Sequence, residues 1–408
     1  MSFEVRTLAS AAEIAEADLI AAHAFGSSRR HTMGESVERF ADKFPPEWYV
    51  GAFEDGEMTS MMRTLPVEMY INGAALSFGA VSPVANSPLH RRKGHSGAML
   101  RRSLEQMRER GQVLSGLYTP HPAFYRRYGW EIASDSRLYS FKPKDFGLLV
   151  EPSQRGRFRF LKVEDWQSLA PVYERYAAQG NGAFRRPEHW WRSYVADIPW
   201  RPGTDVVLWQ NDAGLDEGYG VYQQPMTSGT DYEVASVFVR ELIAASSDAY
   251  LNLLGYFGRH DIHREITIAG SPYDALPVLF ADTEKLQIKQ DWAVLLRVVD
   301  FEASMRARPA AREDETCELT LRLVDESAPW NDGTWRVGVA EGKTWAQQTD
   351  GESELTLSSR VLAPLFNGYL SPRVAEAAGL LDAASDDVLE RAARVLAVRR
   401  PPFFVDHF

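Results

Sequence analysis

Two turn signals restrict the fold of the first third of this chain more than any other feature. Asp55-Gly56 and Asn72-Gly73 each stand between strand-like runs, and both dipeptides tolerate the positive φ angles of a tight hairpin turn. A capping-box sequence, Ser10-Ala-Ala-Glu13, predicts a helix before them. The order therefore indicates a helix followed by an antiparallel meander. The three strand-like runs are Trp48–Phe53, Thr59–Tyr70 and Ala75–Asn86.

The segment after the meander combines a basic, glycine-containing loop with a helix. The loop is Arg91–Gly97, the amphipathic helix is Ala98–Arg110, and Gly111 is a typical helix stop. A strand at Val113–Tyr118, a short helix and a strand near Trp130 follow. This part of the chain therefore predicts strand, loop, helix, strand, helix and strand in succession.

The same order of elements returns between Arg157 and Val299, which indicates a diverged internal duplication. The second copy lacks the basic loop, because its third strand leads into Glu241-Leu-Ile-Ala-Ala-Ser246. A linker, Ala307–Thr316, precedes a third unit of strands followed by helices. We therefore expect an α/β (α+β) protein with domains at residues 1–145, 146–300 and 301–408. The helices of the third unit are expected from Ser359, Ser371 and Asp386.

Charge and cysteine content exclude several classes of function. The 45 basic and 56 acidic residues give a net charge of −11, which repels nucleic acid and favours a cationic small molecule. Cys317 is the only cysteine of the 408 residues, so no intrachain disulfide or cysteine-based metal cluster is expected. No secretory signal and no apolar run of about 18 residues is present. We expect a cytoplasmic protein without membrane, nucleic-acid or metal partners.

The basic loop is the sharpest chemical signal in the chain. It has the pattern R-x-x-G-x-S and opens a helix, where free backbone N–H groups and the helix dipole favour an anion. Gly94, Ser96 and Gly97 are small enough for close approach, and the basic side chains before them add positive charge. The pattern is neither a Walker motif nor the dinucleotide fingerprint. We interpret it as a diphosphate site; an exposed basic turn is the alternative.

A second motif, Phe124-Tyr125-Arg-Arg-Tyr128-Gly129-Trp130, follows about thirty residues later. Together the two motifs resemble the GNAT superfamily of acetyl-CoA-dependent N-acetyltransferases. The resemblance implies that the loop binds the diphosphate of coenzyme A and that Tyr125 protonates the leaving thiolate. Tyr128 is the competing tyrosine, because it lies three residues on and near the same helix face.

The organisation of the whole chain resembles the Eis family of bacterial aminoglycoside acetyltransferases. That resemblance implies a second GNAT-like domain without the cofactor loop, a C-terminal domain like a sterol carrier protein, a homohexamer and a role in antibiotic resistance. It also implies that the C-terminal carboxylate of Phe408 is the general base. The apolar tail, with Phe403 and Phe404, favours a docked end over a frayed one.

Carried over by motif, the acetyl-CoA contacts come from a strand, the loop and the segment after the next strand. Two residues depart from the family pattern, since Asn86 replaces an apolar residue and Ser96 replaces glycine or alanine. Both positions are expected to contribute mainly backbone groups. Phe25, after the first helix, is expected in the acceptor pocket. The implied contacts are Val84, Ala85, Asn86, Arg92, Lys93, Gly94, His95, Ser96, Gly97, Pro120 and His121.

The acceptor is not fixed by these residues. The resemblance implies a polycationic small-molecule amine such as an aminoglycoside. A peptide or protein lysine, or a polyamine, is the alternative acceptor within the same enzyme class. A protein of another class, which binds an apolar ligand through the third unit without catalysis, is the third alternative.

Overall fold

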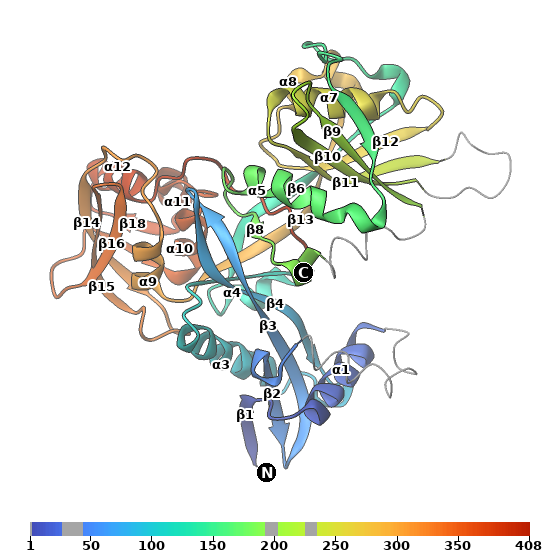
Figure 1. Ribbon diagram of the computed structural model, residues 1–408. Coiled ribbons are helices and arrows are strands. Elements are labelled where there is room, and N and C mark those ends of the chain that lie inside the picture. Colours follow the sequence, from blue (N-terminus) through green and yellow to red (C-terminus); the bar gives the residue numbers. More distant parts are fainter. Residues whose placement is uncertain (1, 27–43, 192–202, 225–234) are drawn as a thin grey trace.

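The computed structural model describes residues 2–26, 44–191, 203–224 and 235–408. In Figure 1 the N-terminal elements lie at the bottom, the green and yellow middle of the chain at the upper right, and the orange and red C-terminal domain at the left. The chain does not end in that last lobe. Its C-terminus lies near the centre of the view, close to where the three parts meet.

The first lobe has the helix and meander that the turn signals predict. Asp55 and Asn72 have φ angles of 49° and 50°, and the glycine after each has a φ of 88°, so both tight turns are confirmed. Helix α1 is capped by Ser10, whose hydroxyl accepts from the N–H of Glu13, but the Glu13 carboxylate accepts from Ala9 rather than from Ser10. The elements are β1 Phe3–Thr7, α1 Ala11–Phe25, β2 Tyr49–Glu54, β3 Glu57–Ile71, β4 Ala74–Asn86, α3 His95–Glu109, β5 Leu114–Tyr118, α4 Pro122–Arg126 and β6 Glu131–Phe141.

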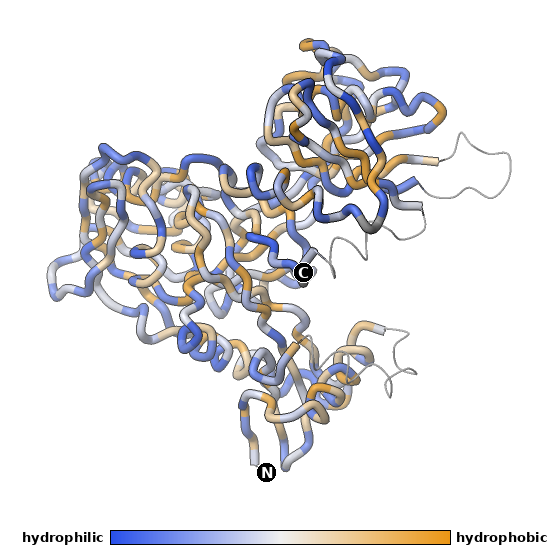
Figure 2. Tube along the Cα trace, in the orientation of Figure 1, coloured by the Kyte–Doolittle hydropathy of each residue, from blue (hydrophilic) through white to orange (hydrophobic). Residues whose placement is uncertain are grey.

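The second lobe repeats this succession of helices and strands. In Figure 2 orange and blue stretches alternate in this lobe, at the upper right, and along β11 buried and less buried residues alternate as expected for a strand with one face on the core. The helix predicted at Pro187–Ala196 lies partly outside the described residues, as does the start of the strand predicted at Tyr232–Arg240. The elements are β7 Arg157–Phe160, α5 Leu169–Ala177, β8 Phe184–Arg185, α6 Glu188–Trp190, β9 Thr204–Gln210, β10 Asp216–Gln223, β11 Ser236–Ala244, α7 Ser247–Gly258, β12 Glu265–Gly270, α8 Leu276–Leu279 and β13 Gln287–Val298.

The two lobes share one continuous sheet because each receives the final strand of the other. Strand β13 of the second lobe pairs with β5 of the first, and β6 of the first lobe pairs with β12 of the second. β13 and β6 also pair with each other in antiparallel fashion. The strand order is β1-β2-β3-β4-β5-β13-β6-β12-β11-β10-β9-β7. The expected order of elements holds, but the crossing of these two strands was not anticipated.

The third domain has its own five-stranded sheet, in the order β16-β15-β14-β17-β18. The predicted helix starts at Ser359 and Asp386 are confirmed, and Ser371 is the N-cap of α11. A helix that was not predicted, Phe301–Ala307, precedes the predicted linker and ends at its first residue. The elements are α9 Phe301–Ala307, β14 Cys317–Val324, β15 Gly333–Ala340, β16 Lys343–Gln348, β17 Leu355–Ser358, α10 Ser359–Phe366, α11 Pro372–Ala377, β18 Leu381–Ala383 and α12 Asp386–Val395.

A buried ion pair joins this domain to the shared sheet. Arg297 of β13 donates to both carboxylate oxygens of Asp325, at 2.7 and 2.5 Å, and neither side chain is exposed to solvent. Removing one partner of such a pair would leave a buried charge without compensation. The third domain is therefore fixed against the strands that the two lobes exchange.

Candidate active site

The two strands that border the predicted cofactor site, β4 and β5, pair with each other over only a short stretch. β4 and β5 run parallel, with Phe78 opposite Leu114 and Ala80 opposite Gly116, and no pairing continues beyond that point. The last part of β4, from Val81 to Asn86, pairs only with β3 on its other side. Val84 and Ala85 therefore lie on a strand whose open edge faces the gap beside β5. Such a separation of parallel strands exposes backbone groups to a ligand.

The predicted loop leads directly into α3. Gly94 is the N-cap residue and has a φ of 88°, a conformation that glycine adopts at little cost. The first helical hydrogen bonds run from the N–H groups of Gly97 and Ala98 to the carbonyl of Gly94. The N–H groups at the start of a helix have no acceptor within it, so those of His95 and Ser96 are free to bind an anion.

The basic side chains of the loop differ in their surroundings. Arg91 and Arg92 are exposed, and Arg92 has a φ of 66°. Lys93 is bound instead to Glu54, with 2.7 Å between Nζ and Oε2. Its hydrogen bond lowers the pKa of the Glu54 carboxyl below the usual range. The two arginines therefore remain to meet a diphosphate, whereas the charge of Lys93 is shared with a carboxylate.

The two departures from the family pattern bind each other. The Asn86 amide donates to the Ser96 hydroxyl at 2.7 Å, and that hydroxyl lies 2.9 Å from the Asn86 carbonyl oxygen. Ser60 also donates to this oxygen, at 2.6 Å. The expectation that positions 86 and 96 contribute mainly backbone groups is therefore incomplete. Their side chains tie the end of β4 to the first turn of α3.

The side chain of His95 faces inward from the loop. It is buried, its Nδ1 lies 2.9 Å from the Thr59 hydroxyl, and its ring stacks on Phe3 at 4.9 Å. Its Nε2 lies 3.3 Å from Glu54. His95 therefore offers a ligand only its backbone N–H and fixes the loop through its ring.

The two competing tyrosines have different environments. The hydroxyl of Tyr128 packs against Gly97, where a Cβ would overlap it, and Arg101 lies over its ring. Among the described residues, the hydroxyl of Tyr125 has no hydrogen-bond partner. Burial raises the pKa of Tyr125 to about 12. Tyr125 therefore holds its proton at neutral pH, and Tyr128 supports the glycine of the loop.

The C-terminal tail is anchored by a buried carboxylate. Asp406 accepts hydrogen bonds from the hydroxyl of Tyr173 at 2.7 Å, from the N–H of Phe184 at 2.9 Å and from Arg186 at 2.6 Å. Arg186 also binds Glu241 through both terminal nitrogens, at 3.0 and 2.8 Å. A fully buried charge is stable only when paired and hydrogen-bonded, and Asp406 meets both conditions.

This anchor directs the last residues toward β5. The Tyr118 hydroxyl donates to the Asp406 carbonyl at 2.6 Å. The ring of Phe408 packs against Tyr118 at 5.3 Å and against Phe184 at 5.5 Å. Tyr118 is the final residue of β5, and the α4 helix with Tyr125 begins four residues later. The terminal residue therefore lies at the end of the strand that borders the predicted cofactor gap.

The remaining predicted contacts are less closely grouped. Pro120 and His121 are exposed, and the N–H of His121 binds the hydroxyl of Thr119 at 2.9 Å. Phe25 is exposed at the end of α1, directly before residues 27–43, which lie outside the described part. The structure thus brings together the loop, β4, β5, α4 and the tail, but not Phe25.

Two functional features escaped sequence reasoning. The first is the Asn86–Ser96 hydrogen bond, which joins the end of a strand to the start of a helix and which no local sequence pattern predicts. The anchoring of Asp406 by Arg186 had one usable signal, because a lone carboxylate between Phe404 and Phe408 is out of place in an apolar segment. A charge in such a position indicates a buried partner, although its identity cannot be read from the chain.

Comparison with known proteins agrees with this geometry. Residues 4–133 and, separately, residues 182–298 match families described as acetyltransferase (GNAT) domains, and residues 301–405 match a sterol carrier protein domain. An uncharacterized N-acetyltransferase from Streptomyces griseus is 26% identical over 381 residues, which is 88% of each chain. The N-acetyltransferase Eis from Mycobacterium tuberculosis is 27% identical over 347 residues, covering 80% of this chain and 79% of the relative.

Solved structures share the whole fold. Eis1 from Mycobacterium abscessus superposes with a TM-score of 0.84 and 24% identity, and a GCN5-related N-acetyltransferase from Anabaena variabilis with a TM-score of 0.85 and 20% identity. Both alignments cover the full length of both chains.

Two acetyltransferase domains, the second without a cofactor loop, and a sterol carrier protein domain define a tandem GNAT N-acetyltransferase. GNAT enzymes take their acetyl group from acetyl-CoA, and the open helix N-terminus beside separated strands fits its diphosphate. Over most of its length the chain is similar to the N-acetyltransferases named Eis, as its motifs indicated. Among the described residues, no helix is long and apolar enough to cross a bilayer, and no three potential metal ligands lie together.

Proposed function

We propose that this enzyme transfers the acetyl group directly from acetyl-CoA to an amino group of a polycationic small molecule such as an aminoglycoside. The observation that carries the proposal is the anchored tail, which brings Phe408 beside Tyr118, at the end of the strand that leads to Tyr125. A proton donor and a proton acceptor are thereby available at one edge of the cofactor gap.

The cofactor is proposed to lie in the gap between β4 and β5. Backbone groups of Val84, Ala85 and Asn86 would bind its pantetheine arm along the open edge. The N–H groups of the loop, with Arg92, would bind its diphosphate at the start of α3. Pro120 and His121 would border it beyond β5. The bound thioester supplies an acetyl group that is already activated toward attack by an amine.

The remaining chemistry is proton transfer by this chain. An ammonium acceptor must lose a proton before it can attack, and the α-carboxylate of Phe408, directly or through water, is the proposed base. Burial raises the pKa of Tyr125 to about 12, so its Oη holds a proton. Tyr125 Oη donates that proton to the thiolate of coenzyme A. The two groups act on different atoms, so they do not compete for one proton.

The acceptor class rests on charge and on the family resemblance. A net charge of −11 raises the local concentration of cations near the protein. The resemblance to the Eis family of aminoglycoside acetyltransferases, which the sequence motifs carry, favours an aminoglycoside as the acceptor. A peptide lysine or a polyamine remains the second candidate, since both are cationic amines. The hexameric assembly is likewise a proposal from the family resemblance, and the cytoplasmic location is a proposal from the sequence.

A panel of amines tests the proposal directly. The protein is incubated with acetyl-CoA and, separately, with an aminoglycoside, a polyamine, a lysine peptide and a buffer control, and the release of free thiol is followed. The expected result is fastest release with the aminoglycoside and product one acetyl group heavier per transfer. Release with the lysine peptide alone would reassign the acceptor. Thiol release with none of the amines would contradict the proposed function.

A further inference from the structure

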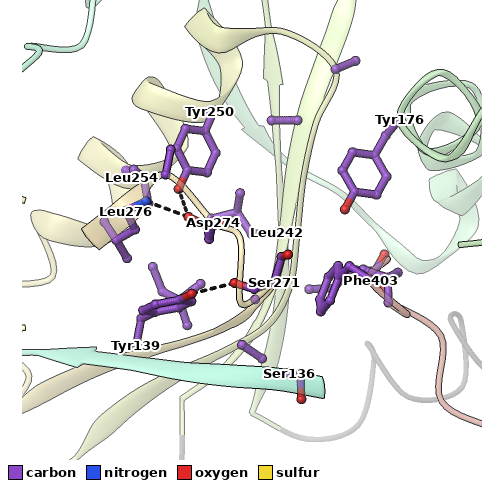
Figure 3. Close-up of a pocket in the computed structure, with 18 of the residues that line it drawn as sticks. Ser136, Tyr139, Tyr176, Leu242, Tyr250, Leu254, Ser271, Asp274, Leu276 and Phe403 are labelled. Carbon is purple, nitrogen blue, oxygen red and sulfur yellow. Dashed lines mark hydrogen bonds between the residues drawn. The ribbon is translucent and has the colours of Figure 1, made fainter. Parts of the chain in front are cut away.

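The second lobe contains a cavity of about 570 Å³ that the proposed acetyl transfer does not use. β11 and β12 pair in parallel only from Ser236 and Glu265 to Val239 and Ile268, and the cavity lies where they separate (Figure 3). This position repeats the gap between β4 and β5 in the first lobe. Phe403 and Phe404 of the tail line the other side.

This cavity is unsuited to a diphosphate. The helix that starts beside it, α7, is capped by Ser246, which accepts from the N–H of Ala249 at 3.2 Å. The hydroxyl of Ser246 in turn donates to the Glu217 carboxylate at 2.9 Å, and Asp248 lies in the first turn. The basic loop of the first lobe has no counterpart here. A second coenzyme A would therefore meet carboxylates where its phosphates need cations.

One carboxylate in the cavity has an unused oxygen. The Oδ1 atom of Asp274 accepts from the hydroxyl of Tyr250 and from the N–H of Leu276, the latter at 2.8 Å (Figure 3). The Oδ2 atom has no hydrogen-bond partner among the described residues, and none of their basic side chains forms an ion pair with Asp274. Burial raises the pKa of this carboxyl. A carboxylate that is partly buried without a counter-charge is stabilised by any cation that reaches it.

The part of the wall nearest Asp274 is apolar and aromatic. Leu242, Leu254 and Leu276 lie around Asp274, and the rings of Tyr139 and Tyr176 border the space (Figure 3). Aromatic rings attract cations through their faces, and leucine side chains contact an apolar body. A volume of this size, with apolar and polar side chains together in its lining, is typical of small-molecule sites.

Two of the other charged groups that line the cavity bind partners elsewhere, and three more share the cavity with Asp274. Glu241 is bound to Arg186 and Tyr219, and Arg400 donates to Gln179 at 3.2 Å. Asp291 also lines the space, as do Arg240 and His407. Asp274 is therefore the carboxylate whose free oxygen and surrounding rings best suit an ammonium ion.

We propose that the cavity between β11 and β12 binds an organic ammonium ion with an apolar or aromatic body, its nitrogen against Asp274 Oδ2. The site is separate from the loop at Gly94 and does not depend on the assignment of Tyr125 or Phe408. It makes the second lobe a binding domain rather than an inert copy of the first.

A matched pair of probes separates charge from shape. Tryptamine carries an ammonium group, whereas tryptophol has the same indole body with a neutral hydroxyl. Ligand-observed NMR on the full-length protein should show tryptamine binding at least tenfold more tightly than tryptophol. Asp274→Asn should weaken tryptamine binding about tenfold, and Asp291→Asn, which removes another carboxylate of the same cavity, should change it less than twofold.

A cavity-filling change provides an independent check. Leu242→Trp should remove tryptamine binding, while circular dichroism and acetyl-CoA affinity in the first lobe stay unchanged. Three results would each overturn the proposal. The two probes could bind equally well, Asp274→Asn could bind tryptamine as tightly as the parent does, or tryptamine could fail to bind at millimolar concentration. Turnover of an amine in the first lobe is unaffected by any of these outcomes, so failure here leaves the proposed acetyl transfer intact.

Discussion

Tyr125 and Tyr128 lie three residues apart, and of these two hydroxyls it is that of Tyr128 that packs against Gly97 of the loop. Tyr125→Phe should lower kcat by roughly 10²–10⁴-fold, the usual contribution of a positioned general acid, and leave acetyl-CoA affinity nearly unchanged. Tyr128→Phe removes a hydroxyl that packs on Gly97, so it should affect acetyl-CoA affinity more than kcat. Steady-state kinetics and calorimetry on both variants measure this split. An inactive Tyr128 variant beside an active Tyr125 variant would show that the acid is assigned to the wrong tyrosine.

The pH profile offers a second measure at the same residue. Because burial raises the pKa of Tyr125 to about 12, its hydroxyl remains protonated throughout the usual assay range. Titration of Tyr125 should therefore cause no loss of turnover between pH 8 and about pH 10, and any decline in that range should be the same in the parent and in Tyr125→Phe. A decline in that range that is present in the parent and absent in the variant would mean that this hydroxyl titrates far lower than its surroundings imply.

Asn86 and Ser96 form a contact that a double-mutant cycle can isolate. Asn86→Leu leaves the Ser96 hydroxyl with an apolar neighbour, and Ser96→Ala leaves the Asn86 amide without its partner. Each single change should weaken acetyl-CoA binding, whereas the double variant should lose less than the sum, with a coupling of about 1 kcal/mol. Calorimetric titration with coenzyme A gives all four affinities. Strict additivity would mean that the two side chains act independently.

At the scale of elements, the loop before α3 is tested by a pair of substitutions at Gly94. Its φ of 88° tolerates asparagine better than most residues, and open space surrounds a Cβ at this position. Gly94→Asp should abolish acetyl-CoA binding, because its carboxylate would stand beside the diphosphate. Gly94→Asn has the same size without the charge and should retain much of the affinity. Equal losses in the two variants would point to backbone strain instead of charge.

The tail is the second element with a direct test. Asp406→Asn keeps the shape of the side chain but removes the charge that Arg186 binds, and it should lower the free energy of unfolding by about 3 kcal/mol. It should also release the tail, so limited proteolysis should remove the last residues faster. Acetyl-CoA affinity should change little, since the loop is separate. A stable, fully active variant would show that the ion pair does not position Phe408.

Local sequence signals account for much of the fold and part of the site. The Asp-Gly and Asn-Gly turns fixed the meander because their φ angles are a local property, and the loop motif identified the start of α3. The pairing of β6 and β13 with strands far away in the chain is different, because no local pattern reveals which strands will lie beside them. The pairing of Asp406 with Arg186 joins residues 220 positions apart, which no local pattern specifies.

At the scale of the whole molecule, the terminal carboxylate can be moved without changing any side chain. Two residues added after Phe408 would replace that carboxylate with a neutral amide. The extended protein should fold and bind acetyl-CoA but lose most acetylation, while two residues added at the N-terminus should have no effect. Residual activity should rise steadily with pH, because the amine then loses its proton to bulk solvent. Full activity after the C-terminal addition would leave the base unassigned.

The exchange of β6 and β13 has a consequence for how this protein can be divided. Cutting the chain between the two GNAT domains would separate β5 from β13 and β12 from β6. β5 and β12 would each become the edge of a sheet, with unpaired N–H and carbonyl groups. Neither fragment is then an autonomous folding unit, although each contains a recognisable domain sequence. Swapping one acetyltransferase domain for that of a relative would meet the same obstacle. Chimeras of this family should therefore keep both halves from one parent, and a third domain from another parent would have to supply partners for Arg297 and Arg186 in place of Asp325 and Asp406.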